Sequence, residues 1–62
     1  MSNVILQSKD TGLYLCGWDL FGKPKFIQDK KLAETMNFPT ADRVSKNLKN
    51  IFGKGDFELI RV

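Results

Sequence analysis

Two short apolar runs near the start of the chain are separated by a polar turn. Residues 4–8 and 13–18 are rich in β-branched, aliphatic and aromatic side chains, and the polar segment between them ends in glycine. Gly12 tolerates the positive φ that a tight turn requires, and the Asp10 side chain can bond to nearby backbone. The pattern therefore predicts a β-hairpin.

The middle of the chain predicts a third strand, followed by a segment with two interpretations. Residues 19–24 contain glycine and proline and predict a turn, which residues 25–28 follow as a strand. In residues 32–38 the apolar spacing fits a helical face at first and an alternating strand at the end. Because proline disfavours helical backbone at the residue before it, we expect one helical turn and then an extended segment that includes Phe38.

An amphipathic helix after Pro39 is the clearest element. Thr40 is a favourable N-cap, and Asp42 in the first turn complements the helix dipole. Gly53 is placed to cap the C-terminal end, with Lys54 beside the negative end of the dipole. The apolar residues that form one stripe along the helix are Ala41, Val44, Leu48, Ile51 and Phe52.

These elements predict an α+β fold with one amphipathic helix packed on one face of a small antiparallel sheet. The order is β-β-β-α-β, with three to five strands and the last strand at residues 57–62. Residues 1–62 form one domain, because a chain of this length buries only about 60% of its unfolded surface around one thin core. A deep substrate cavity would consume most of that core, so size argues against a self-contained enzyme.

The second strand carries aromatic side chains whose face is the main open question. Strict alternation places Tyr14, Cys16 and Trp18 on one face, opposite Leu13 and Leu15. If the leucines face the helix, Tyr14 and Trp18 stand on the open side of the sheet as candidate interface anchors. If the faces are reversed, Trp18 is the largest core residue. Both arrangements remain open.

The composition matters mainly for the chemistry it excludes. The chain has no histidine, which removes the commonest general base and metal ligand, and Cys16 is its only cysteine. Without a histidine to activate it, Cys16 is expected to pack in the sheet. The acidic residues are scattered, and the Gly-Lys pairs do not form a phosphate loop. We therefore expect no catalytic residue, metal site or cofactor, and a protein that works by binding.

The net charge is +3, from ten Lys and Arg residues against seven Asp and Glu residues. This sign permits an anionic partner without requiring one. The leading hypothesis is a protein partner, and the alternative is a nucleic acid bound by basic patches on the helix and the third strand. The residues expected to contact a protein partner are Tyr14, Trp18, Phe21, Arg43, Lys46 and Asn50. Those expected to contact a nucleic acid are Lys23, Lys25, Lys30, Lys31 and Lys49.

Several turn and core positions carry a resemblance. They are Asp10–Leu15, Gly17-Trp18, Gly22–Phe26, Ala33, Phe38 and the helix beginning at Thr40. This order resembles small early accessory proteins of bacteriophages and prophages, in which a "TGxYL" hairpin leads to "G-x-P-x-F" and one amphipathic helix. The resemblance implies a modulator or inhibitor that binds a host or phage protein and occludes its surface. It supplies no catalytic or binding residues.

The remaining expectations concern location and assembly. Residues 1–6 lack the basic start and long apolar run of a signal peptide, and no apolar run in the chain is long enough to span a membrane. We therefore expect a cytoplasmic protein without membrane contact, in the bacterial host if it is phage-encoded. It is expected to be a monomer or a weak homodimer that pairs through exposed aromatic residues or an edge strand.

Overall fold

The structure is a computed structural model that describes residues 3–62. Met1 and Ser2, part of the segment considered above for an export signal, lie outside the described residues. One α-helix packs against a five-stranded antiparallel sheet in the described part, which is the α+β class that the sequence predicts. The elements in chain order are β1 (Asn3–Ser8), β2 (Tyr14–Trp18), β3 (Pro24–Ile27), the 3₁₀-helix η1 (Lys30–Leu32), β4 (Met36–Asn37), α1 (Phe38–Asn50) and β5 (Phe57–Arg61).

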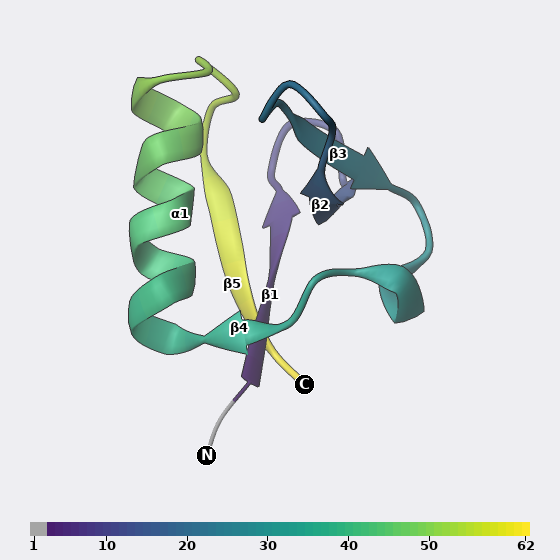
Figure 1. Ribbon diagram of the computed structural model, residues 1–62. Coiled ribbons are helices and arrows are strands. Elements are labelled where there is room, and N and C mark those ends of the chain that lie inside the picture. The colour runs from purple at the N-terminus through teal and green to yellow at the C-terminus, as the bar shows by residue number, and fades with distance from the viewer. Residues whose placement is uncertain (1–2) are drawn as a thin grey trace.

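The central strand of the sheet is β1 (Figure 1). On one side β1 pairs with the whole of β5. On its other side β1 pairs with β2 through Gln7 and Tyr14, and the first two residues of β1 pair with β4. Between these last two pairings β1 and β2 diverge. The segment before β4 bonds to β2 there, since the Glu34 backbone N–H donates to the Leu15 carbonyl at 2.8 Å. This contact ties the middle of the chain to the sheet.

The helix α1 begins earlier than the sequence predicts. Asn37, rather than Thr40, is the N-cap, and its Oδ1 accepts the Thr40 N–H at 3.0 Å. Pro39 lies in the first turn, where its missing N–H costs no hydrogen bond. The expectation that Phe38 is extended is therefore wrong, because the first turn of a helix accommodates the proline that follows it.

The C-terminal end of α1 also differs from the expectation. Ile51 is the C-cap, and its N–H donates to the Asn47 carbonyl at 2.8 Å. Gly53 follows with a φ of 62°, a left-handed conformation that glycine adopts without strain, and turns the chain toward β5. The Lys54 N–H then donates to the Leu48 carbonyl at 3.1 Å. Ile51 is exposed, whereas Phe52, the next residue of the predicted stripe, packs against the core.

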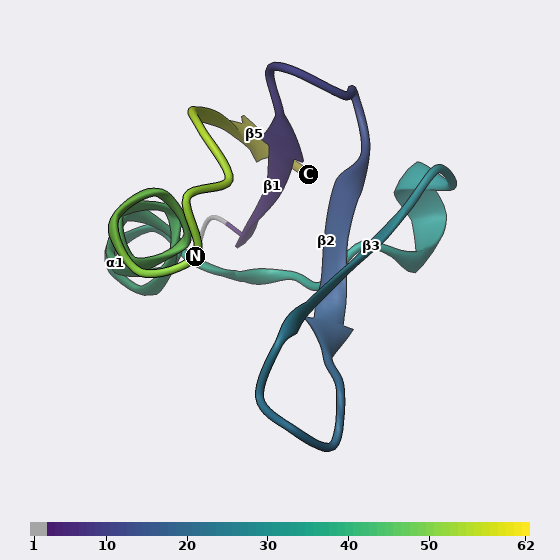
Figure 2. The same cartoon turned by 90° about the horizontal axis from the view of Figure 1, so that it is seen from above.

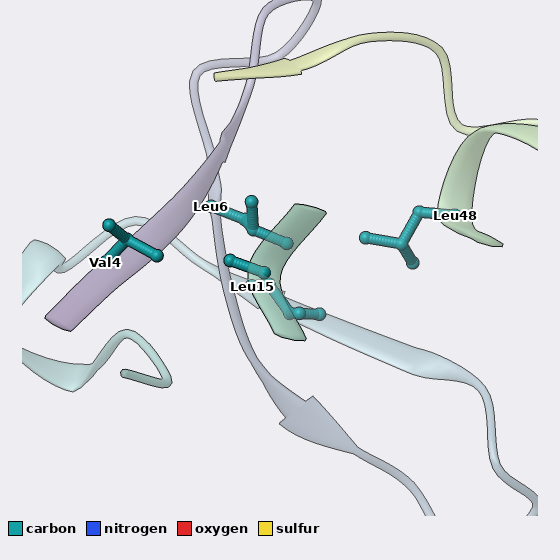
Figure 3. Close-up of a cluster of buried hydrophobic side chains, with 5 residues drawn as sticks. Val4, Leu6, Leu15 and Leu48 are labelled. Atoms are coloured by element: carbon teal, nitrogen blue, oxygen red, sulfur yellow. The ribbon is translucent and has the colours of Figure 1, made fainter. Parts of the chain in front are cut away.

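The core lies between α1 and the sheet. Figure 3 shows Leu6, Leu15 and Leu48 pointing toward one another from β1, β2 and α1. Each fully buried aliphatic side chain of this size contributes roughly 1.5–3 kcal/mol. Docking of the helix therefore depends on its two buried residues. The fully buried cluster consists of Val4, Leu6, Leu15, Ala41 and Leu48.

The opposite face of the sheet is partly covered as well. Ile5 alternates with the core residues of β1 and so points away from α1, yet it is buried. Its neighbours on that face include Ala33 and other residues of the segment 29–35, which contains η1. Figures 1 and 2 both place η1 on the other side of the sheet from α1. The helical turn expected within residues 32–38 thus lies slightly earlier, and the expected extended segment is β4.

Candidate functional site

A hydrogen-bonded turn, residues 19–23, joins β2 to β3. The Asp19 N–H donates to the Lys23 carbonyl at 2.9 Å, and the Gly22 N–H donates to the Asp19 carbonyl at 3.1 Å. The Asp19 Oδ1 accepts the N–H of Phe21 at 2.8 Å and that of Lys23 at 2.9 Å. Gly22 has a φ of 78°, as in the three-residue hairpin loop that a left-handed glycine closes. The turn therefore has a fixed conformation.

Two large apolar side chains occupy the outer positions of this turn. Leu20 is 99% exposed and Phe21 is 86% exposed. Such turn positions usually hold Gly, Pro, Asn, Asp or Ser, because these residues satisfy turn geometry and interact with water. Full burial of each apolar side chain would release about 1.5–3 kcal/mol. We call Leu20 and Phe21 together the hairpin tip.

Behind the hairpin tip, β2 contains a β-bulge. Leu15 pairs with Phe26, but the next pair is Gly17 with Lys25, so Cys16 is the extra residue on β2. Gly17 has a φ of 150°, which residues with a side chain rarely adopt. The Cys16 thiol donates to the Lys25 carbonyl, with Sγ 3.4 Å from the oxygen. The bulge reverses the alternation of side chains beyond it.

The expected grouping of Tyr14, Cys16 and Trp18 on one face is therefore wrong. Trp18 lies on the helix side of the sheet, where its ring centroid is 6.2 Å from that of Phe52 just after α1. Trp18 is 44% exposed, so it is neither a fully buried core residue nor an anchor on the opposite face. Tyr14, before the bulge, stays on the opposite face and is half-buried.

Aromatic rings continue from Trp18 along the helix side of the sheet. The rings of Phe26 and Phe57 are stacked, with centroids 5.8 Å apart and an angle of 21° between planes. Phe26, Phe52 and Phe57 are half-buried against the core, and a pocket of about 250 Å³ opens beside Phe26, Phe57 and Leu13. We call Trp18, Phe26, Phe52 and Phe57 the aromatic surface.

One acidic and two basic side chains lie near the hairpin tip. The hydrogen bond from the Lys23 backbone N–H lowers the pKa of Asp19 below its ordinary value, and partial desolvation opposes this shift. The Phe21 N–H and the charges of Lys23 and Lys25 lower the pKa further. Asp19 therefore stays ionised and engaged with the turn, while Lys23 and Lys25 remain exposed to solvent.

The other residues predicted to bind a protein partner lie away from the hairpin tip. Arg43, Lys46 and Asn50 are exposed on α1, and Lys46 forms an ion pair with Asp42 at 3.2 Å. Tyr14, Trp18 and Phe21 of the predicted set lie on the β2–β3 hairpin, but only Trp18 and Phe21 lie at or next to its turn. The structure adds Leu20, which the sequence analysis missed. The available signal was a Leu-Phe pair inside a turn, where polar residues are usual.

The five lysines of the nucleic-acid hypothesis do not form one patch. Two lie in η1, while Lys49 lies on α1 at the opposite side of the sheet (Figure 2). Lys49 Nζ is 3.0 Å from Asp56 Oδ1, and this hydrogen-bonded pair lowers the pKa of Asp56. The remaining two, Lys23 and Lys25, lie near the start of β3. The five lysines are therefore spread over separate parts of the protein surface.

Within residues 3–62, no three cysteine, aspartate or glutamate side chains lie close enough to hold a metal ion. No helix in that part of the chain has the length and apolar character needed to cross a membrane. Comparison of the chain with protein-family models, with curated proteins and with solved structures found no match.

Proposed function

We propose that this chain is a non-enzymatic binding module that anchors to another protein through the hairpin tip. The observation that carries the proposal is the near-complete exposure of Leu20 and Phe21 on a turn that Asp19 holds in place. Because the backbone of the turn is already ordered, binding through it loses less conformational entropy than binding through a flexible loop. Aromatic residues that enter a partner's pocket are also frequent energetic centres of protein interfaces.

The aromatic surface would extend the contact beyond the hairpin tip. A specific complex buries about 800 Å² on each partner, which is more than two side chains provide. Trp18 is half-exposed next to the turn, and the rings behind it offer apolar area on the same side of the sheet. Once bound, the domain would occlude the partner's surface around the pocket that receives the tip.

The nature of the partner is proposed from the resemblance described above. Small phage accessory proteins of that type act on host or phage proteins, so a host or phage protein is the proposed target and modulation or inhibition by occlusion is the proposed effect. Nucleic acid is the alternative partner. The dispersal of the lysines over η1, α1 and β3 favours it less, because phosphate binding needs positive charges gathered along one surface.

The test compares capture of partners from an extract of the organism that encodes the chain. Three baits are used: the wild-type chain, the double variant Leu20→Ser/Phe21→Ser, and the control Leu32→Ser, which changes an exposed leucine in η1. We expect one or more proteins to be retained by the wild type and the control and lost from the tip variant. Equal retention by all three baits would contradict the role of the tip.

The nucleic-acid alternative is tested with the same three chains. Each is titrated with single-stranded and double-stranded DNA at about 50 mM salt and again at higher salt, because phosphate contacts weaken steeply as salt rises. Salt-sensitive binding that the tip variant retains would replace the proposal with the alternative. If none of the three chains binds DNA, the nucleic-acid alternative is rejected and the protein partner stays the proposal.

A further inference from the structure

The outer edge of β5 is a second surface, away from the hairpin tip, and it shares Phe57 with the aromatic surface. Within residues 3–62, β5 pairs only with β1. The Lys9 N–H donates to the Asp56 carbonyl and the Val62 N–H donates to the Asn3 carbonyl, each at 3.0 Å. Because hydrogen-bonded pairs alternate in an antiparallel ladder, every second residue of β5 points its backbone away from β1. These outward residues, whose N–H and C=O groups have no partner in the described part, are Phe57, Leu59 and Arg61.

A groove of about 240 Å³ lies between this edge and α1. Figures 1 and 2 together show α1 lying over one face of the sheet on the β5 side, so that the helix borders this edge from that face. The side chains of Phe57 and Leu59 are half-buried on this side, next to the core. They form the apolar part of the groove, and α1 forms its polar wall. The α1 residues of that wall are Asp42, Ser45, Lys46 and Lys49.

We propose that this edge binds an extended peptide segment of another protein as an added antiparallel strand. Unpaired N–H and C=O groups at strand spacing are matched by another extended backbone, as in peptide recognition by strand addition. Residues directly opposite each other in a sheet place their side chains on the same face. Every second peptide side chain would therefore point into the groove beside α1.

The charge of Arg61 and the half-buried Leu59 and Phe57 determine which peptide side chains fit this edge. Arg61 is exposed at the end of β5, lies on the same face as Leu59, and makes no ion pair among residues 3–62. Lys46 and Lys49 each pair with a carboxylate, whereas Arg61 has no such partner among residues 3–62, so an acidic ligand group gains most opposite Arg61. The proposed peptide runs antiparallel to β5. Going from its N-terminus, it needs an acidic residue opposite Arg61. An aliphatic residue follows two positions later opposite Leu59, and a second one opposite Phe57.

A second copy of this chain does not match that pattern. Two β5 strands paired antiparallel about Leu59 would place Phe57, rather than an acidic residue, opposite Arg61. The two-fold axis of such a pair is normal to the sheet, so both α1 helices would lie on the same face beside the shared edge. Each helix already borders the groove that the other would need. A peptide without a helix beside it is therefore the favoured occupant.

The test uses a fluorescein-labelled synthetic nonapeptide with the sequence Lys-Thr-Glu-Thr-Val-Thr-Val-Thr-Lys. Fluorescence anisotropy should show saturable binding with a Kd below about 1 mM. N-methylation of the first valine, opposite Leu59, removes a ladder donor and should weaken binding at least tenfold. Replacement of the glutamate by lysine should weaken it by a similar factor. Absence of saturable binding, or equal binding of the N-methylated peptide, would overturn the proposal.

Two variants of the protein separate the backbone from the charge. Arg61→Pro removes an outward N–H and leaves the bonds to β1 in place, as proline on an edge strand allows. Arg61→Ala keeps the N–H and removes only the charge. We expect binding to be lost in the first variant and reduced severalfold in the second, with circular dichroism confirming that both fold. If Arg61→Pro unfolds, the N-methylated peptide decides the question alone.

Mapping and assembly measurements complete the test. The largest amide shifts on peptide addition should fall at residues 57–61, and the variant Leu20→Ser/Phe21→Ser should bind the peptide as the wild type does. Loss of binding in that variant, or shifts centred on the hairpin tip, would overturn the edge site. A concentration-dependent dimer in sedimentation that the peptide fails to dissociate would assign the edge to a second copy and would overturn it as well.

Discussion

The rings of Trp18 and Phe52 lie with centroids 6.2 Å apart and an angle of 44° between their planes. This contact joins the end of β2 to the chain just after α1, and it forms because the bulge at Cys16 turns Trp18 toward the helix side. Tilted aromatic pairs at this separation are favourable beyond the area they bury. The contact therefore helps to fix the hairpin that carries the tip relative to the helix.

The Trp18–Phe52 contact can be measured by a double-mutant cycle. With Trp18→Leu and Phe52→Leu, urea unfolding should give a coupling of about 0.5–1.5 kcal/mol, the usual range for an aromatic pair. Phe52→Leu alone should shift the emission of Trp18, the only tryptophan, to longer wavelength as the ring meets more water. A coupling indistinguishable from zero would mean that the two rings do not stabilise each other.

The bulge depends on glycine at position 17. Gly17→Ala should destabilise the fold by roughly 1–3 kcal/mol, because φ at this position is 150° and a residue with a side chain is strained there. No atom lies within 4 Å of the added Cβ, so the cost is conformational rather than steric. Cys16→Ala, at a neighbour with ordinary φ, is the control and should cost less. Equal effects of the two changes in chemical unfolding would count against the strained backbone.

The same bulge shows where prediction from the pattern stops. The 3.6-residue period correctly identified Ala41 and Leu48 as core, because burial on one face of a helix enforces that period, whereas alternation along β2 left the face of Leu15 open. The apolar alternation does not show the extra residue at Cys16, because the pairing with β3 defines it; the glycine inside the strand, Gly17, is its only local sign. The face of Trp18 could therefore not be derived from β2 alone.

Phe21 of the hairpin tip was predicted as a partner contact, whereas Leu20 and the edge of β5 were not, for different physical reasons. The turn at residues 19–24 was recognised from its glycine and proline, but the exposure of Leu20 depends on the Asp19 hydrogen bonds that close the turn. The open edge of β5 follows from which strands pair with β1, and pairing between distant segments is not encoded in local periodicity. Burial of Ile5 beneath the segment 29–35 is equally non-local.

The Asp19 carboxylate should make the hairpin tip sensitive to pH. The pKa of Asp19 is lower in the folded chain than in the unfolded one, chiefly through the Lys23 N–H. Its stabilising effect is therefore complete above the unfolded pKa and is lost as the pH falls through the lower, folded pKa. Below a pH of about 4, the NMR shifts of the Phe21 and Lys23 amides should move toward unfolded values.

Two substitutions at Asp19 distinguish the hydrogen bonds from the charge. Asp19→Asn keeps an oxygen acceptor, so the turn should survive while the pH dependence of the Phe21 and Lys23 amide shifts disappears. Asp19→Ala removes the acceptor and should loosen the turn at neutral pH, which the same amide shifts report. An unchanged turn in Asp19→Ala would show that the side chain does not organise it.

Leu48 should be the most sensitive position on α1. It is fully buried between the helix and the sheet, and truncation of such a leucine to alanine costs about 2–5 kcal/mol. A single core in a chain of this size supplies on the order of 3–5 kcal/mol in total. Leu48→Ala should therefore be largely unfolded by circular dichroism, whereas Asn47→Ala, on the exposed side of the helix, should stay folded. A stable Leu48→Ala variant would show that this contact does not hold the helix to the sheet.

The start of α1 provides a prediction on which the sequence and the structure disagree. The Asn37 Oδ1 accepts the Thr40 N–H at 3.0 Å, so Asn37→Ala leaves an N-terminal helix donor without its partner and should cost about 0.5–2 kcal/mol. Thr40→Ala keeps that N–H and should cost less. Asn37 also belongs to β4, but its pairing with Asn3 uses the backbone and survives the substitution. Thermal unfolding of the two variants decides between the caps: a larger loss in Thr40→Ala would return the cap to Thr40, where the sequence placed it.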